Sequence, residues 1–159
     1  SSDMTRTVPV NGKFSNRQKI IYNAVLNVKN EATSLLRPGV LWKDYHIEVG
    51  KIMTSELVRI GLLDKADLQN ESVDQPAYKK YFMHGTSHHM GLDTHDYGLL
   101  HLPMEAQMVF TVEPGIYIPK EGFGIRLEDD VVIQEQGEPL NLMADIPIEI
   151  EAIESNMNP

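Results

Sequence analysis

Two long segments in the first half of the chain carry apolar residues at the spacing of an amphipathic helix. The first follows Ser15, a suitable N-cap residue, and ends at Pro38-Gly39. The second covers residues 43–60 and ends at Gly61. Each helix is expected to bury one face. The apolar positions are Ile20, Ile21, Ala24, Val25, Val28, Ala32, Leu35 and Leu36 in the first segment, and Val49, Ile52, Met53, Leu57 and Ile60 in the second.

The second half of the chain has the composition of β-strands. Residues 108–118 and 124–134 are rich in Val, Ile, Phe and Tyr, with glycine and proline at their ends and between them, so we expect two consecutive strands. Near the start of the chain, residues 5–10 are β-branched and alternating, and the turn pair Asn11-Gly12 follows them. This pattern predicts a further strand.

The order of these elements predicts the fold class. Residues 64–80 are polar and aperiodic, which indicates a surface loop with a short helix, and Pro147 is expected to open a last helix through Ile153. A strand, two helices and then several strands are typical of an α+β fold, with helices on one face of a curved sheet. The 159 residues fit a single domain.

Composition excludes several kinds of partner. The formal net charge is -9 and no basic stripe offsets it, which argues against binding to nucleic acid. The sequence has no cysteine, so any metal must take oxygen and imidazole ligands. The first residues lack the core of a signal peptide, and no apolar run approaches the length of a membrane span. We therefore expect a cytoplasmic protein without a membrane partner.

Five of the six histidines lie between His84 and His101. The segment from His84 reads His-Gly-Thr-Ser-His-His-Met-Gly-Leu-Asp-Thr-His-Asp. Each histidine taken alone is more often a solvated or structural side chain than a functional one. The density of imidazoles nevertheless favours a functional site, because imidazole is the commonest neutral metal ligand and titrates near neutral pH.

Two glutamates interrupt the apolar runs of the second half. Glu113 and Glu128 each lie within a predicted strand, where an inward-facing charge costs several kcal/mol unless it is paired or bound to a metal. Glu113 could instead face outward, and Glu128 could pair with Arg126, which alternation places on the same face. Asp3, at the head of the first predicted strand, could be a solvated terminal residue. Carboxylates beside a histidine cluster indicate a site for manganese, iron, cobalt or zinc.

Four sequence pieces together resemble the M24 metallopeptidases of the pita-bread fold, and within them the aminopeptidase P (Xaa-Pro aminopeptidase) branch. These pieces are Asp3-Met-Thr-Arg-Thr-Val-Pro-Val-Asn-Gly-Lys-Phe, the segment from His84 quoted above, Thr111-Val-Glu-Pro-Gly-Ile-Tyr-Ile and Gly124-Ile-Arg-Leu-Glu-Asp-Asp-Val. They occur in the family's order and span nearly the whole chain. The resemblance implies a curved antiparallel sheet with helices on its outer face.

The resemblance also implies the roles of individual residues. It implies two divalent metal ions, Mn²⁺ above all, with Co²⁺, Zn²⁺ and Fe²⁺ as alternatives. The implied metal ligands are Asp3, His88, Glu113 and Glu128. The implied catalytic residues are Glu113, which moves protons, with His84 and His95. The implied substrate-binding residues are His84, His95 and Arg126. The expected reaction uses a metal-bridging hydroxide to cut the bond between an N-terminal residue and proline, so the partners are peptides with proline at the second position.

One implied metal ligand has no counterpart in this sequence. The family has a further aspartate about a dozen residues before the one matched by Asp3, so residues 1–159 are expected to be a C-terminal catalytic domain without its first strand and without an N-terminal domain. We expect this chain alone to be inactive. The strand at residues 5–10 would then present an unpaired edge, which favours self-association into a homo-oligomer.

Three other functions share parts of this pattern. A prolidase would cut only dipeptides, and Ser87 favours aminopeptidase P because prolidases usually have glycine there. A metal-free relative such as creatinase, or a pita-bread binding module that has lost catalysis, would have little need for the four ligand residues. These alternatives are tested by a peptidase assay and by metal analysis.

Overall fold

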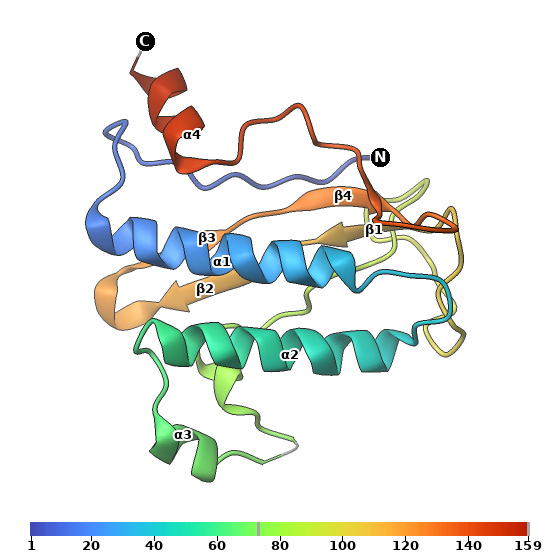
Figure 1. Cartoon of the computed structure of the whole chain (residues 1–159), viewed down its shortest axis with the longest axis horizontal. Coiled ribbons are helices and arrows are strands. Elements are labelled where there is room, and N and C mark those ends of the chain that lie inside the picture. The colour runs from blue at the N-terminus through green and yellow to red at the C-terminus, as the bar shows by residue number, and fades with distance from the viewer. Residues whose placement is uncertain (73, 159) are drawn as a thin grey trace.

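Two long helices lie side by side and form one layer of the molecule. The computed structural model describes residues 1–72 and 74–158. Helix α1 covers Asn16–Ser34 and α2 covers Trp42–Arg59 (Figure 1). The bounds of α2 lie within one residue of the prediction, whereas α1 ends before Leu35 and Leu36, which were predicted to belong to it. Ser15 caps α1 in a capping box, because its side chain accepts from the Gln18 amide while the Gln18 side chain accepts from the Ser15 amide.

The two predicted strands form one long antiparallel hairpin whose arms are both interrupted. The strands are β1 (Val109–Val112), β2 (Gly115–Ile118), β3 (Phe123–Arg126), β4 (Asp129–Val132) and β5 (Leu140–Asn141). β1 pairs with β4, β2 pairs with β3, and β5 adds to the free edge of β4. Unbroken strands over residues 108–118 and 124–134 are therefore a wrong prediction, since each arm breaks where its glutamate lies.

Hydrogen bonds to other segments explain the two breaks. Pro114 has no amide hydrogen to donate to a ladder. The amide of Glu113 donates to the carbonyl of Thr86 at 2.7 Å, and the amide of Glu128 donates to the carbonyl of Thr5 at 3.0 Å. Both glutamates thus direct their amides away from the hairpin ladder. These two hydrogen bonds hold the segments that contain Thr86 and Thr5 next to the hairpin.

The helices cover one face of the hairpin and make the core with it. Phe110, Val112 and Val131 are fully buried on that face. Asp129 has the same orientation in β4, and its carboxylate is held by Lys29 of α1 and by Arg6 Nη2 at 2.6 Å. Burial raises the pKa of Asp129, but the two cations outweigh it and hold the pKa below its usual value. The expected α+β arrangement, with helices on one face of an antiparallel sheet, is confirmed.

The two ends of the chain differ from the predictions. Residues 5–10 form no strand: Thr5 makes an isolated bridge to Glu128, and further along, beside β3, it is the hydroxyl of Thr7 and not its main chain that bonds the carbonyl and the amide of Arg126. The expected unpaired strand edge at residues 5–10 is therefore wrong. Helix α4 covers Ile150–Met157 and begins later than Pro147, whose carbonyl accepts from Arg6 instead.

The remaining segments are short. The predicted loop at residues 64–80 contains helix α3 (Lys65–Gln69) and a 3-10 turn (Ala77–Lys80), so a short helix there is confirmed, although Val73 lies outside the described residues. A second 3-10 turn, Pro119–Glu121, closes the hairpin. Of the helices that the structure describes, none has the length and hydropathy needed to cross a bilayer.

Candidate metal centre

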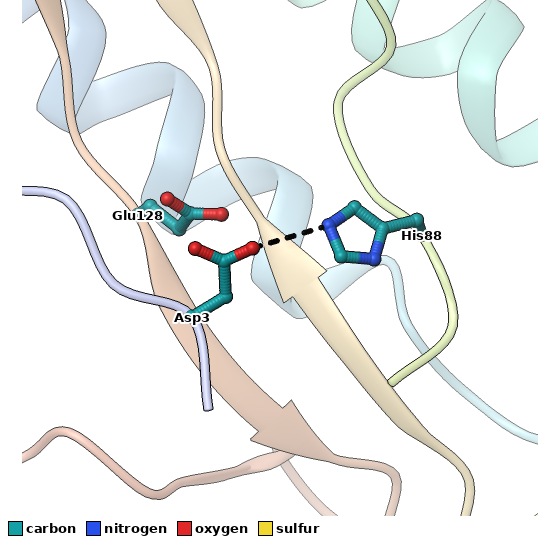
Figure 2. A group of neighbouring side chains, drawn as sticks. All are labelled: Asp3, His88 and Glu128. Carbon is teal, nitrogen blue, oxygen red and sulfur yellow. Dashed lines mark ion pairs between the residues drawn. The ribbon is translucent and has the colours of Figure 1, made fainter. Parts of the chain in front are cut away.

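Asp3, His88 and Glu128 meet on the face of the hairpin opposite α1. Figure 2 shows their side chains converging from the N-terminal segment, from the histidine-rich loop and from the break before β4. One ligand atom from each residue lies within 4.8 Å of the others, and Asp3 Oδ2 is 3.6 Å from His88 Nε2. Three of the four predicted metal ligands therefore surround one point.

His88 is placed by a loop that runs along the outer edge of β1. Glu113 donates its amide to Thr86, Thr111 donates to the carbonyl of His88 at 3.1 Å, and Met90 donates to Val109 at 3.1 Å. The amide of His88 in turn donates to Thr111 Oγ1 at 3.1 Å. The loop is thus held almost as an extra strand, and this fixes the position from which the His88 ring projects.

The ring of His88 is oriented for binding through Nε2. Its Nδ1 lies 3.0 Å from the carbonyl of His89, so a neutral ring with its proton on Nδ1 donates there. That tautomer leaves the Nε2 lone pair facing the carboxylates of Asp3 and Glu113. This is the arrangement in which imidazole acts as a metal ligand.

Glu128 and Asp3 are placed along β4. Glu128 is buried, with 1% of its surface exposed, and Thr5 donates its hydroxyl to Glu128 Oε2 at 2.6 Å. The amide of Asp3 donates to Asp130 Oδ2 at 3.0 Å. The contact of Thr5 with Glu128 and the contact of Asp3 with Asp130 therefore hold the N-terminal segment against Glu128 and β4.

Glu113 adjoins the group through His88. Its Oε1 is 3.5 Å from His88 Nε2, and its Oε2 is 3.8 Å from Arg126 Nη1. Burial, together with the charge of Glu128, raises the pKa of Glu113 to about 7, against the opposing effects of His88 and Arg126. Arg126 thus contacts Glu113, and its Nε donates to Thr5 Oγ1 at 3.1 Å, so the alternative pairing of Arg126 with Glu128 is not what these contacts show.

The two other predicted site histidines lie on different sides of this group. The ring of His95 is exposed and its centroid is 4.2 Å from that of His88, so the structure brings it to the site. His84 lies further along the hairpin, where its Nε2 is 2.7 Å from the hydroxyl of Tyr117 in β2 and its Nδ1 is 2.8 Å from the carbonyl of Gly85.

Other members of the histidine-rich segment have structural contacts. The ring of His89 packs against Phe110 and lies parallel to that of Trp42, and burial lowers the pKa of His89. The carboxylate of Asp96 accepts from the amide of Tyr97 at 2.8 Å and so stabilises a turn. His89 and Asp96 therefore have structural roles. The high density of histidines in the sequence could not distinguish these two residues from those of the site.

The donor set fits divalent cations. Three carboxylates and one imidazole gather where Arg126 is the one guanidinium or ammonium group that the described residues bring within 4 Å of Glu113. The cluster thus has an excess of formal negative charge, and the charges of Glu128 and Asp3 add to burial, the main cause, in raising the pKa of Glu113. Bound cations would offset this excess, and oxygen with imidazole ligands suits manganese, iron, cobalt or zinc.

Sequence reasoning missed the residues that support the ligands. Thr5, Thr111 and Asp130 each hold a ligand or its backbone, yet none was singled out. A signal was present for Asp130, because Glu128-Asp-Asp places three carboxylates in succession within an apolar strand. Alternation puts the first and third on one face, and so would have added Asp130 to the site.

Known proteins resemble this chain over nearly its whole length. The sequence model of metallopeptidase family M24 matches residues 1–135. The chain is 44% identical over 168 residues to the Xaa-Pro aminopeptidase of Escherichia coli, covering 96% of this chain and 37% of that protein. It is 37% identical over 164 residues to Xaa-Pro aminopeptidase 3 of Homo sapiens, covering 96% of this chain and 32% of that protein.

Solved structures show the same likeness. Zinc-substituted aminopeptidase P of Escherichia coli in complex with product superposes with a TM-score of 0.84 at 43% identity, over 98% of this chain and 37% of that chain. The aminopeptidase PepP of Pseudomonas aeruginosa superposes with a TM-score of 0.87 at 38% identity, over 98% of this chain and 38% of that chain. The chain therefore spans less than half the length of each of these relatives.

Proposed function

The chain belongs to metallopeptidase family M24 and has the pita-bread fold, and from this premise we propose that the protein is a Xaa-Pro aminopeptidase. Its substrates would be peptides with proline at the second position, cut between the N-terminal residue and that proline. Similarity to proteins named Xaa-Pro aminopeptidase supports the substrate class.

One observation carries the proposal. Asp3, His88 and Glu128 present ligand atoms within 4.8 Å of one another, and Glu113 Oε1 lies 3.5 Å from His88 Nε2. These four residues are far apart along the chain, and a purely structural ion pair would not need three carboxylates around one imidazole. A proposed pair of divalent cations, most favourably Mn²⁺, would supply a more acidic water and a positive charge for the carbonyl oxygen of the scissile bond.

We assign separate roles to the neighbouring side chains. Glu113 would take a proton from the attacking water and return it to the leaving proline nitrogen, a step for which its carboxylate is placed by its position beside His88. Arg126, 3.8 Å from Glu113, would orient that carboxylate and contact the substrate. His95 would stabilise the oxyanion from beside His88, and His84 would contact the proline side of the substrate.

The sequence supplies four of the five ligands that the family resemblance implies. We therefore propose that residues 1–159 bind metal more weakly than a protein with the complete set, and that they do not hydrolyse peptides by themselves. The peptidase assay therefore uses the longer protein of which residues 1–159 are proposed to be a part, called here the parent protein. Metal binding can be measured in the parent protein and in residues 1–159 alone.

Glu113→Gln in the parent protein tests the assigned mechanism. The change preserves the size of the side chain but removes its ability to accept a proton, so we expect kcat to fall by at least about 100-fold. Hydrolysis of a tripeptide with proline at its second position, with Mn²⁺ present, is the measurement. A dipeptide ending in proline, assayed in parallel, separates an aminopeptidase from a prolidase.

Glu135→Gln is the matched control, because Glu135 is exposed beyond β4 and the substitution makes the same change in charge. It should leave kcat unaltered. Unchanged turnover in Glu113→Gln would disprove the role of Glu113. A parent protein that takes up Mn²⁺ but cuts neither peptide would disprove the proposed activity and would favour a binding module.

A further inference from the structure

Asp130 is a buried carboxylate on the same face of the hairpin as Glu128. It lies opposite Thr111 in the β1–β4 register, and only 1% of its surface is exposed. Its Oδ1 has no hydrogen-bond partner among the described residues. A buried, incompletely paired carboxylate is costly, and an apolar side chain would avoid that cost. Packing therefore gives no reason for a carboxylate at this position.

The edge of β4 explains what Asp130 does. Thr5 forms a bridge with Glu128, and continuing that antiparallel register brings Asp3 opposite Asp130. The main-chain carbonyl of Asp130, however, already accepts from the amide of Leu142 at 2.9 Å, where the chain continues from β5. This edge of the strand is therefore already occupied at Asp130, and the amide of Asp3 donates elsewhere.

The side chain of Asp130 provides the missing acceptor. Its Oδ2 receives the Asp3 amide at 3.0 Å, so the N-terminal segment stays in register past the point where β5 takes over the strand edge. The hydroxyl of Thr5 meets Glu128 one step earlier. These two contacts hold the segment on both sides of Met4, and they bring the carboxylate of Asp3 toward Glu128.

We infer that Asp130 is a positioning residue, which substitutes its side-chain carboxylate for a main-chain carbonyl and thereby fixes Asp3 beside Glu128 and His88. The inference rests on the proposed function in that Asp3 is taken as a metal ligand. Loss of a residue that orients a metal ligand lowers metal affinity by about 10- to 100-fold, and this is the effect expected here.

Two substitutions separate positioning from charge. Asp130→Asn keeps an oxygen that can accept from the Asp3 amide, whereas Asp130→Ala removes the acceptor. We expect Mn²⁺ affinity of the 159-residue chain, measured by calorimetric titration, to fall about 10- to 100-fold in Asp130→Ala and to be largely retained in Asp130→Asn. Asp145→Ala, at an exposed aspartate, is the control for lost charge and should match the unaltered chain.

Hydrogen exchange of the Asp3 amide gives a readout that does not depend on metal. Protection should be lost in Asp130→Ala, kept in Asp130→Asn and kept in Asp145→Ala, with the amides of α1 unaffected in all three. A general loss of structure would expose α1 as well, so this comparison distinguishes positioning from unfolding.

The possible results separate this inference from the proposed function. Unchanged Mn²⁺ affinity and Asp3 protection in Asp130→Ala would overturn the inference while the metal site stands. Equal loss of affinity in both Asp130 variants, with Asp3 still protected, would also overturn it and would indicate a charge effect. If the unaltered chain binds no Mn²⁺ but Asp3 protection follows the expected pattern, the positioning role is supported and the proposed metal site is not.

Discussion

Substitution of Lys29 by methionine tests how the helix layer is joined to the strand that carries the site. Lys29 is 4% exposed and donates to Asp129 Oδ2, and Asp129 is itself 1% exposed. Removing one partner of a buried ion pair costs about 3–5 kcal/mol, because the other charge stays buried without compensation. Arg6 and Asn141 still donate to Asp129 at 2.6 and 2.9 Å, so we expect the low end, about 3 kcal/mol.

Urea unfolding followed by circular dichroism measures this loss at neutral pH, where Asp129 is ionised because its pKa is lowered. Lys51→Met is the matched control. Lys51 of α2 pairs with Glu48 at 2.6 Å, but both side chains are at least half exposed, so its loss should cost no more than about 0.5 kcal/mol.

A double variant completes the test. Lys29→Met combined with Asp129→Leu removes both charges but leaves Arg6, whose side chain is 9% exposed, without its carboxylate partner, so we expect the double variant to be no more stable than Lys29→Met. Equal effects of Lys29→Met and Lys51→Met would refute the reasoning. They would show that the cluster around Asp129 makes no larger contribution than an exposed pair.

Two further changes test local features of the helices. Ser15→Ala removes the cap of α1, and we expect the free energy of unfolding to fall by about 1 kcal/mol. Gln18→Ala should cost less, because the Ser15 cap remains. Equal stability of Ser15→Ala and the unaltered chain would contradict the capping role. Tyr45→Phe leaves the buried hydroxyl of Ser87, now 2.8 Å from Tyr45, without its partner, at a cost of about 1–3 kcal/mol. Adding Ser87→Ala should restore part of that loss, and strictly additive losses in denaturant unfolding would show that the two hydroxyls do not interact.

The helices could be predicted because their information is local. The cap at Ser15 and the spacing of the apolar residues after it define α1 without reference to the rest of the chain. The strand breaks could not be predicted in this way, because the amides of Glu113 and Glu128 bind Thr86 and Thr5, which are distant in sequence. The absence of a strand at residues 5–10 has a similar origin, since the hydroxyl of Thr7, and not its main chain, bonds the distant Arg126 of β3.

The candidate site was predictable in part. Glu113 and Glu128 could be identified because charges within apolar strands need a partner, and family resemblance selected His88 from its neighbours. Composition alone could not distinguish His88 from His89, whose ring packs against Phe110 and Trp42. Support for Asp3 depended on a single side-chain hydrogen bond, which only the three-dimensional arrangement reveals.

The interrupted hairpin has a consequence for the order in which the protein folds. Glu113 and Glu128 lie on the two arms of one hairpin, so they come together when a short loop closes. Asp3 must cross to a strand where its contact residue, Asp130, lies 127 positions later. Because contacts between distant residues form late, we expect a nascent chain to assemble its two glutamates first, and the N-terminal aspartate to join the site as one of the last steps.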